Sequence, residues 1–249
     1  MTRVPKRPED ILPGFAADVE KVYGEDLVSI ILFGSGARGE YVPKKSDLNF
    51  LIVVRDNTPS ELSKFQAKLH KWRKSNVATP LFLTEEYIRS SLDTFPIEFL
   101  DMKSAYKLVK GKDILAGLEL SKRDLRLQCE RELKGKMLHL RQAFLESRGK
   151  VKNLPGLVSS SMAGFAPIFK ALLYILGVEP PSKRADLLRK ICQSFDLNYE
   201  LFDDLLQIGR REKKVSASEI NYLFDKYVEE IDRLSEKVDA LSIEEEGGR

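Results

Sequence analysis

The sequence predicts an α+β fold, in which a mixed sheet with flanking helices is followed by an all-α helical bundle. Two continuous apolar runs rich in β-branched residues, 27–33 and 48–54, have the composition of buried strands. From about residue 121 onward, apolar residues instead recur every three or four positions, which is the spacing of amphipathic helices. With 249 residues, the chain is long enough for one large domain or two small ones.

The first half is expected to alternate helices and strands. A helix is predicted from Leu12, because apolar residues follow it at helical spacing as far as Gly24, which suits a helix end. Between the two apolar runs, a segment with three glycines and Pro43 should form turns and at most a short helix. The other elements expected are a helix beginning at Thr58 and Pro59, a strand at 80–84, a helix at 85–92 and a half-buried strand at 96–102.

The second half is predicted to be wholly helical. Its clearest stripe of apolar residues runs from Ile220 to Leu241 and implies a helix that packs in a bundle. Other helices are expected at 125–144, 154–176, 182–195 and 199–212. These patterns divide the chain into an α/β domain at 1–115, a helical bundle at 116–243 and a disordered tail at 244–249.

Composition narrows the class of protein. At 43% hydrophobic and 32% charged residues, the chain has an ordinary globular composition, and a net charge of +3 is too small to argue for nucleic acid. Cys129 and Cys192 are far apart and are expected to be buried thiols in a reducing compartment. No signal peptide or membrane-spanning run is recognised, so we expect a cytoplasmic protein without a membrane partner.

The segment from Ile31 to Val54 contains the candidate residues for binding an anion and a metal ion. Its first apolar run ends at Gly34 and Ser35, a turn whose backbone N–H groups and hydroxyl can bind an anion. Asp47 and Asn49 are two positions apart on the second predicted strand, so both point to the same face. Two oxygen-bearing side chains facing such a turn are suited to a Mg²⁺–triphosphate complex.

This segment resembles the signature of the nucleotidyltransferase superfamily related to DNA polymerase β. The match consists of an apolar strand, Gly-Ser, a loop of about a dozen residues and an acid–apolar–acid pattern on the next strand. The sequences "GSGARGE" and "SDLN" are most similar to small prokaryotic nucleotidyltransferases and to aminoglycoside and lincosamide nucleotidyltransferases. The helix and strand order through Met102 agrees with that fold in outline, and a helical second domain is common there.

The resemblance implies a role for each matching residue. Gly34 and Ser35 would hold the β and γ phosphates of a nucleotide, and Asp47 would bind Mg²⁺ or Mn²⁺. Position 49 should supply a second metal carboxylate. Three further residues, Arg38, Lys44 and Ser46, would help to bind the nucleotide. For Lys44 a solvated loop position explains the residue equally well, and Arg38 could instead pair with a carboxylate to fix the turn.

A third acidic residue should come from a later strand, as a metal ligand or as the base toward the acceptor. The predicted strand at 96–102 offers Glu98 and Asp101, which alternation would place on opposite faces. Glu98 is favoured because it lies between Ile97 and Phe99, and burying an unpaired acid there would be costly. A solvent-facing strand position remains the alternative explanation of Glu98.

Asn49 departs from the family pattern. An Asn offers a metal ion one neutral oxygen and removes one negative charge from the site. The first functional hypothesis is therefore a metal-dependent enzyme that moves an NMP from an NTP to a hydroxyl of a small molecule or protein. The second is a nucleotide-binding pseudoenzyme of the same fold. A third, one half of a toxin–antitoxin-like pair with a fused HEPN-type bundle, is disfavoured because Arg131 and His139 are too far apart for a ribonuclease motif. A homodimer stays open.

Overall fold

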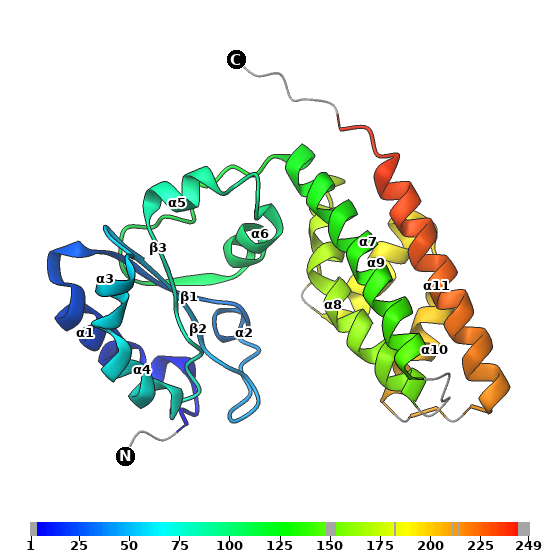
Figure 1. Ribbon diagram of the computed structural model, residues 1–249, viewed down its shortest axis with the longest axis horizontal. Helices are drawn as coiled ribbons and strands as arrows, with labels where there is room; N and C mark the ends of the chain where they lie inside the picture. The colour runs from blue at the N-terminus through cyan, green and yellow to red at the C-terminus, as the bar shows by residue number, and fades with distance from the viewer. Residues whose placement is uncertain (1–3, 148–152, 182, 211, 214, 244–249) are drawn as a thin grey trace. The chain divides into compact units, whose positions relative to one another are not determined.

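The computed structural model describes residues 4–147, 153–181, 183–210, 212–213 and 215–243. The chain divides into two compact units, Met1–Leu120 and Ser121–Arg249, each with its own internal packing (Figure 1). The first unit contains a four-stranded sheet and the second is helical, as the predicted α+β class requires. The predicted tail at 244–249 lies outside the described residues.

The sheet of the first unit has the strand order β3-β2-β1-β4. The central strand β1 pairs antiparallel with β2 and with β4, while β2 pairs parallel with β3. Because β1 and β2 are antiparallel, the end of β1 at Phe33 lies opposite the start of β2 at Asn49. The strands are β1 (Leu27–Phe33), β2 (Asn49–Val54), β3 (Leu81–Leu83) and β4 (Tyr106–Gly111).

Helices cover both faces of this sheet (Figure 1). On one face, the apolar side chains of α1 and α4 pack on β1 and β2, and Phe15 stacks on Phe50 with ring centroids 4.0 Å apart. On the other face, α5 and α6 pack on Ile31 and Leu51. The helices are α1 (Leu12–Tyr23), α2 (Ser35–Arg38), α3 (Pro59–Ser63), α4 (Gln66–Arg73), α5 (Glu85–Ser90) and α6 (Pro96–Ser104), with short 3-10 turns at Pro8–Asp10 and Gly24–Asp26.

Residues 96–102 are helical, so the predicted strand there was wrong. Pro96 occupies the first turn of α6 and Glu98 is the acidic residue of that turn, both of which favour a helix start. Over seven residues, an apolar–polar alternation does not distinguish the period of a strand from that of a helix. The strand that follows is β4, which was not predicted because it is an edge strand with two lysines, Lys107 and Lys110, and only partial burial.

The second unit is a bundle of long helices. α8 packs against α7, α9 and α10, and α11 packs against α7. Fully buried side chains from α8 and α11, including Phe165, Leu172 and Ile231, form its core. The helices are α7 (Lys122–Glu146), α8 (Leu154–Ile175), α9 (Arg184–Phe195), α10 (Tyr199–Gly209) and α11 (Ala217–Asp239).

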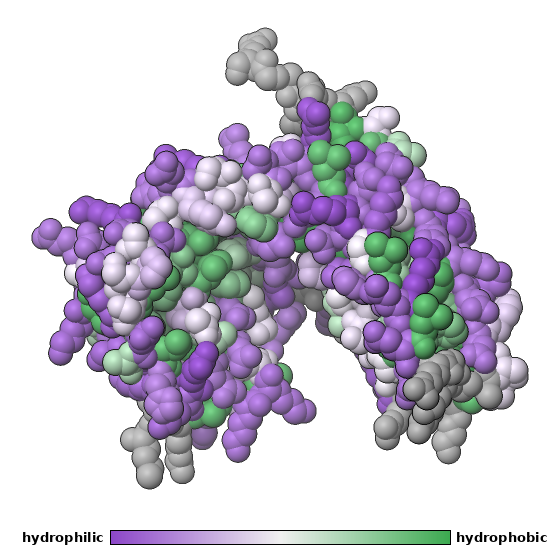
Figure 2. Space-filling view, in the orientation of Figure 1, coloured by the Kyte–Doolittle hydropathy of each residue, from purple (hydrophilic) through white to green (hydrophobic). Residues whose placement is uncertain are grey.

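Helix α8 is long and apolar enough to cross a membrane by length and composition alone, which the sequence analysis did not expect. The core helix of a globular protein can meet the same criteria. Val158, Phe165 and Leu172 of α8 are fully buried within the unit. Figure 2 shows hydrophilic side chains over most of the visible face of each unit, with smaller apolar patches among them. We therefore interpret α8 as the central helix of the bundle.

Candidate functional site

Two of the predicted site residues, Gly34 and Asn49, lie at the edge of the sheet where β1 ends and β2 begins. Phe33 is the register partner of Asn49, so the turn that follows β1 lies beside the residues that precede β2. Gly34 starts this turn with φ 73° and ψ −148°, a backbone conformation that essentially only glycine adopts. At Gly36, an added Cβ would lie 2.8 Å from Cδ2 of Leu48, so a larger residue there would displace the Leu48 side chain.

Backbone hydrogen bonds hold the turn in place. The Gly34 carbonyl accepts the N–H groups of Ala37 and Arg38, each at 3.0 Å, and so starts the four-residue helix α2. The Gly34 N–H donates to the carbonyl of Ala105 at 3.2 Å. This amide, which was expected to bind phosphate, is therefore used to join the turn to the end of α6. The Ser35 hydroxyl stands at the first position of α2, where backbone N–H groups lack intrahelical acceptors.

Asp47 and Asn49 lie on the β2 side of the site. The Asp47 residue is exposed, whereas Asn49 is half-buried, and its Nδ2 lies 3.5 Å from where a Cβ on Gly34 would be. Tyr41 lies near Asp47: burial raises the pKa of Tyr41, and the carboxylates of Asp10 and Asp47 raise it further. Gly34 and Asn49 thus lie side by side at one sheet edge, while Asp47, expected on the strand, lies two residues before the start of β2 at Asn49.

The loop between α2 and β2 is closed by Ser46. Its Oγ accepts the backbone N–H of Val42 at 3.0 Å, and its own N–H donates to the Val42 carbonyl at 2.9 Å. Lys44 lies at the tip of this loop with φ 67° and is exposed. Ser46 therefore shapes the loop, while Lys44 presents its ammonium group to solvent.

Arg38 ends α2 and is mostly buried, with 20% of its side chain exposed. Its Nη2 donates to Oδ1 of Asp101 at 3.3 Å, and its Nη1 lies 3.7 Å from Oε2 of Glu40. The alternative expected from the sequence, that Arg38 pairs with a carboxylate near the turn, is what the structure shows. The carboxylate is Asp101, which sequence analysis had considered only as a metal ligand or base.

Glu98 and Asp101 are both on α6 rather than on a strand. At a separation of three residues, a helix places them on the same face, and the expected opposite orientation was wrong. Glu98 is exposed in the first turn, whereas Asp101 is near the last turn and contacts Arg38. The helix start at Pro96 was the signal that could have corrected this prediction.

The side chains at the candidate site determine whether a metal ion could bind there. Among the described residues, no three His, Cys, Asp or Glu side chains lie close enough to hold a metal ion by themselves. Asp47 and Asn49 offer carboxylate and amide oxygens, which are the ligands that Mg²⁺ accepts, and a nucleotide would have to supply the remaining oxygens. The side chains present therefore fit a cation that arrives with a triphosphate.

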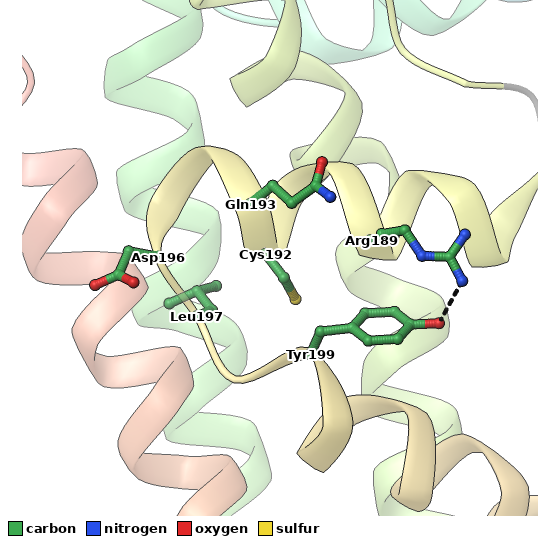
Figure 3. Close-up of a pocket in the computed structure, with 6 residues that line it drawn as sticks. All are labelled: Arg189, Cys192, Gln193, Asp196, Leu197 and Tyr199. Carbon is green, nitrogen blue, oxygen red and sulfur yellow. Dashed lines mark hydrogen bonds between the residues drawn. The ribbon is translucent and has the colours of Figure 1, made fainter.

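A separate pocket of about 340 Å³ lies in the second unit (Figure 3). Arg189 donates to the Tyr199 hydroxyl at 3.2 Å across its mouth, and the Cys192 side chain points inward. It is lined by Arg189, Cys192, Gln193, Asp196, Leu197 and Tyr199. None of the predicted site residues lines it.

Comparison with known proteins agrees with the geometry of the first unit. The family model of the nucleotidyltransferase domain matches residues 15–105. No curated protein sequence matches the chain. A spectinomycin adenyltransferase from Enterococcus faecialis, whose structure contains ATP and spectinomycin, is 15% identical with a TM-score of 0.54, over 88% of this chain and 98% of that chain.

A nucleotidyltransferase-like protein from Exiguobacterium sibiricum is 14% identical over 93% of this chain and 74% of its own. Its TM-score of 0.42 is too low to support an argument. The likeness to the adenyltransferase establishes a shared fold alone, because 15% identity does not carry function. Residues 15–105 thus match the family model of the nucleotidyltransferase domain, and the fold shared with the adenyltransferase agrees with that match.

Proposed function

We propose that the protein transfers a nucleoside monophosphate from an NTP to a hydroxyl group of a small molecule, with Mg²⁺ or Mn²⁺. The observation that supports this proposal is the position of the Gly34–Ser35 turn beside Asn49, with Asp47 two residues before Asn49 in the chain. In such a transfer, the acceptor oxygen attacks the α-phosphorus of the NTP. The bond from that phosphorus to the bridging oxygen breaks, and pyrophosphate leaves.

Each candidate residue is assigned a role in this transfer according to its position. Ser35 and the first N–H groups of α2 would bind phosphate oxygens, together with Arg38 at the end of α2 and with Lys44 and Ser46 on the loop that follows it. Asp47 and Asn49 would hold the metal ion, which supplies positive charge to the triphosphate and the leaving pyrophosphate. We assign Glu98 as the base toward the acceptor hydroxyl, because it is the exposed acid on α6.

A small-molecule acceptor is favoured over a protein side chain by the shared fold. The adenyltransferase with that fold has ATP and spectinomycin in its structure, and nearly its whole length is covered. The shared fold therefore includes the helical second half of this chain as well as residues 15–105. Spectinomycin and related hydroxylated compounds are therefore the first acceptors to test.

A second candidate function is nucleotide binding without transfer. It is supported by Asn49, which replaces a charged ligand with a neutral one. In this case, the protein would bind an NTP through the same turn and act as a regulatory protein.

The test is calorimetric titration of ATP, with and without Mg²⁺, into the wild type, Asn49→Asp and Asp47→Ala. We expect the wild type to bind ATP only with Mg²⁺ and Asn49→Asp to bind it more tightly. Asp47→Ala should lower the affinity for ATP by about tenfold or more. Pyrophosphate release with a panel of hydroxylated acceptors then separates the enzyme from the nucleotide-binding protein. Failure of both the wild type and Asn49→Asp to bind any of the four NTPs in the same titration would refute both functions.

We also propose a cytoplasmic location. Cys129 and Cys192 are both buried free thiols, and burial raises the pKa of each to about 12. Thiols of this kind are ordinary in a reducing compartment, where NTPs are also available. A homodimer remains a prediction.

A further inference from the structure

We propose that Asp101 is a positioning residue that fixes the Arg38 guanidinium to receive the phosphates of the nucleotide, an inference that rests on the proposed function. The contact joins residues 63 positions apart in the chain, one on α2 and one on α6. It therefore forms only when the tertiary structure brings α6 against the turn.

Helix α2 needs such support because it has only four residues. A helix this short is not stable by itself, since nucleating one turn costs more than its few hydrogen bonds return. The end of α6 holds it at both ends: Ala105 accepts the Gly34 N–H before α2 begins, and Asp101 accepts from Arg38 where α2 ends. Arg38 is consequently fixed relative to the Gly-Ser turn.

Asp101 is distinguished from the other carboxylate near Arg38. The Glu40 oxygen lies 3.7 Å from the guanidinium, beyond hydrogen-bonding distance, and its side chain is 46% exposed. The Asp101 oxygen is within reach at 3.3 Å. A guanidinium has five N–H donors, so one bond to Asp101 leaves others that can bind phosphate.

The direction in which Asp101→Asn changes nucleotide affinity distinguishes a positioning carboxylate from one that is merely nearby. A negative charge close to a triphosphate weakens binding by repulsion, so removal of a merely nearby carboxylate should tighten binding. A positioning carboxylate has the opposite effect, because without it the long Arg38 side chain must be ordered when the nucleotide binds. We therefore expect Asp101→Asn to weaken binding, although it removes a like charge.

The experiment measures binding to the full chain by calorimetry with ATP and Mg²⁺, with inorganic tripolyphosphate and with AMP. Asp101→Asn should weaken ATP and tripolyphosphate binding about three- to tenfold and leave AMP binding within about twofold, because AMP lacks the outer phosphates. Arg38→Lys keeps the positive charge but loses the planar guanidinium, so it should show the same losses for ATP and tripolyphosphate and the same AMP binding. It replaces Asp101→Asn in the experiment if that variant folds poorly.

Two comparisons make the result specific. In an Arg38→Gln background, Asp101→Asn should cause no further loss, since a positioning residue acts through its partner. Asp232→Asn is the matched control: it removes an Asp–Arg pair of 2.7 Å with Arg141 in the helical unit and should not change ATP binding.

The inference is overturned if Asp101→Asn binds ATP as well as or better than the wild type, or if the loss persists without Arg38. It is also overturned if AMP binding falls by the same factor, because that pattern indicates general damage to the unit. A wild type that binds ATP with Mg²⁺ keeps the proposed function intact in each of these cases. If the wild type binds no NTP, the proposed function fails and the inference fails with it.

Discussion

Gly34 is the residue on which the geometry of the candidate site most depends. Its φ of 73° with ψ −148° lies in a region that residues with a Cβ rarely adopt, and the turn, α2 and the contact with Ala105 all follow from it. Asn49 lies against the open side of this glycine. A single backbone conformation thus sets where Ser35 and Arg38 are presented.

Replacing Gly34 with Ala should lower the free energy of unfolding by about 1–3 kcal/mol, because the backbone would be strained. ATP binding should fall as well, since relaxation of the turn would displace Ser35. Urea denaturation and calorimetry measure the two effects. Gly117→Ala is the control, because that glycine has no positive φ and no atom within 4 Å of an added Cβ. Equal stability of Gly34→Ala and the wild type would contradict the strain argument.

At the scale of elements, α1 and α4 are joined by Asp18. Its carboxylate accepts from Lys68 at 2.7 Å, from Lys71 at 2.6 Å and from the Trp72 indole N–H at 3.1 Å. Burial alone would raise the pKa of Asp18, but the hydrogen bonds from the two lysines outweigh it and lower the pKa below the usual value. The charged form of Asp18 is therefore favoured in the folded protein.

A group whose pKa is lowered on folding contributes stability above its unfolded pKa of about 3.9 and loses it as the pH falls further. Asp18→Asn should therefore lower the free energy of unfolding by about 1–2 kcal/mol at pH 7, and the difference should shrink below pH of about 4. Urea denaturation across this pH range measures it. Glu229→Gln, which removes an exposed pair with Lys226, should leave the free energy of unfolding nearly unchanged throughout. A pH-independent effect of Asp18→Asn would be inconsistent with the linkage.

The edge strand β4 ends at Gly111, a second glycine at which a side chain would be costly. Gly111 has φ 84°, and a Cβ there would lie 2.1 Å from the Val28 carbonyl oxygen on β1. Gly111→Ala should therefore destabilise the first unit by at least about 3 kcal/mol, through backbone strain and overlap together. Thermal denaturation of this variant beside Gly117→Ala measures the cost. A midpoint shared by both variants would mean that β1 and β4 move apart freely.

At the scale of the whole molecule, the two units should respond differently to nucleotide. The candidate site lies entirely within the first unit, and a bound ligand stabilises the state that binds it by about 2.7 kcal/mol at a concentration of 100 times Kd. Hydrogen exchange with ATP and Mg²⁺ should slow at 34–49, and exchange at 184–209, around the pocket of Figure 3, should be unchanged. Slowing at 184–209 alone would place the nucleotide in the other unit.

Long periodic patterns were sufficient to predict much of this molecule. The apolar run at 27–33 forms β1 at those residues, and the stripes beyond residue 121 form the helices of the bundle. The Gly34–Ser35 turn could be predicted because turn chemistry is a local property of the chain, whereas Asp47, predicted on the strand, precedes β2.

The sequence by itself was thus sufficient to predict the fold class and to single out Gly34, Asp47 and Asn49 as candidate site residues. Only the tertiary structure decided that residues 96–104 form a helix, that β4 completes the sheet, and that Asp101 contacts Arg38. Short segments carry too few residues to define a period, so their packing partners choose between helix and strand. A contact between residues 63 positions apart leaves no local pattern, because it exists only once the sheet and α6 have packed together.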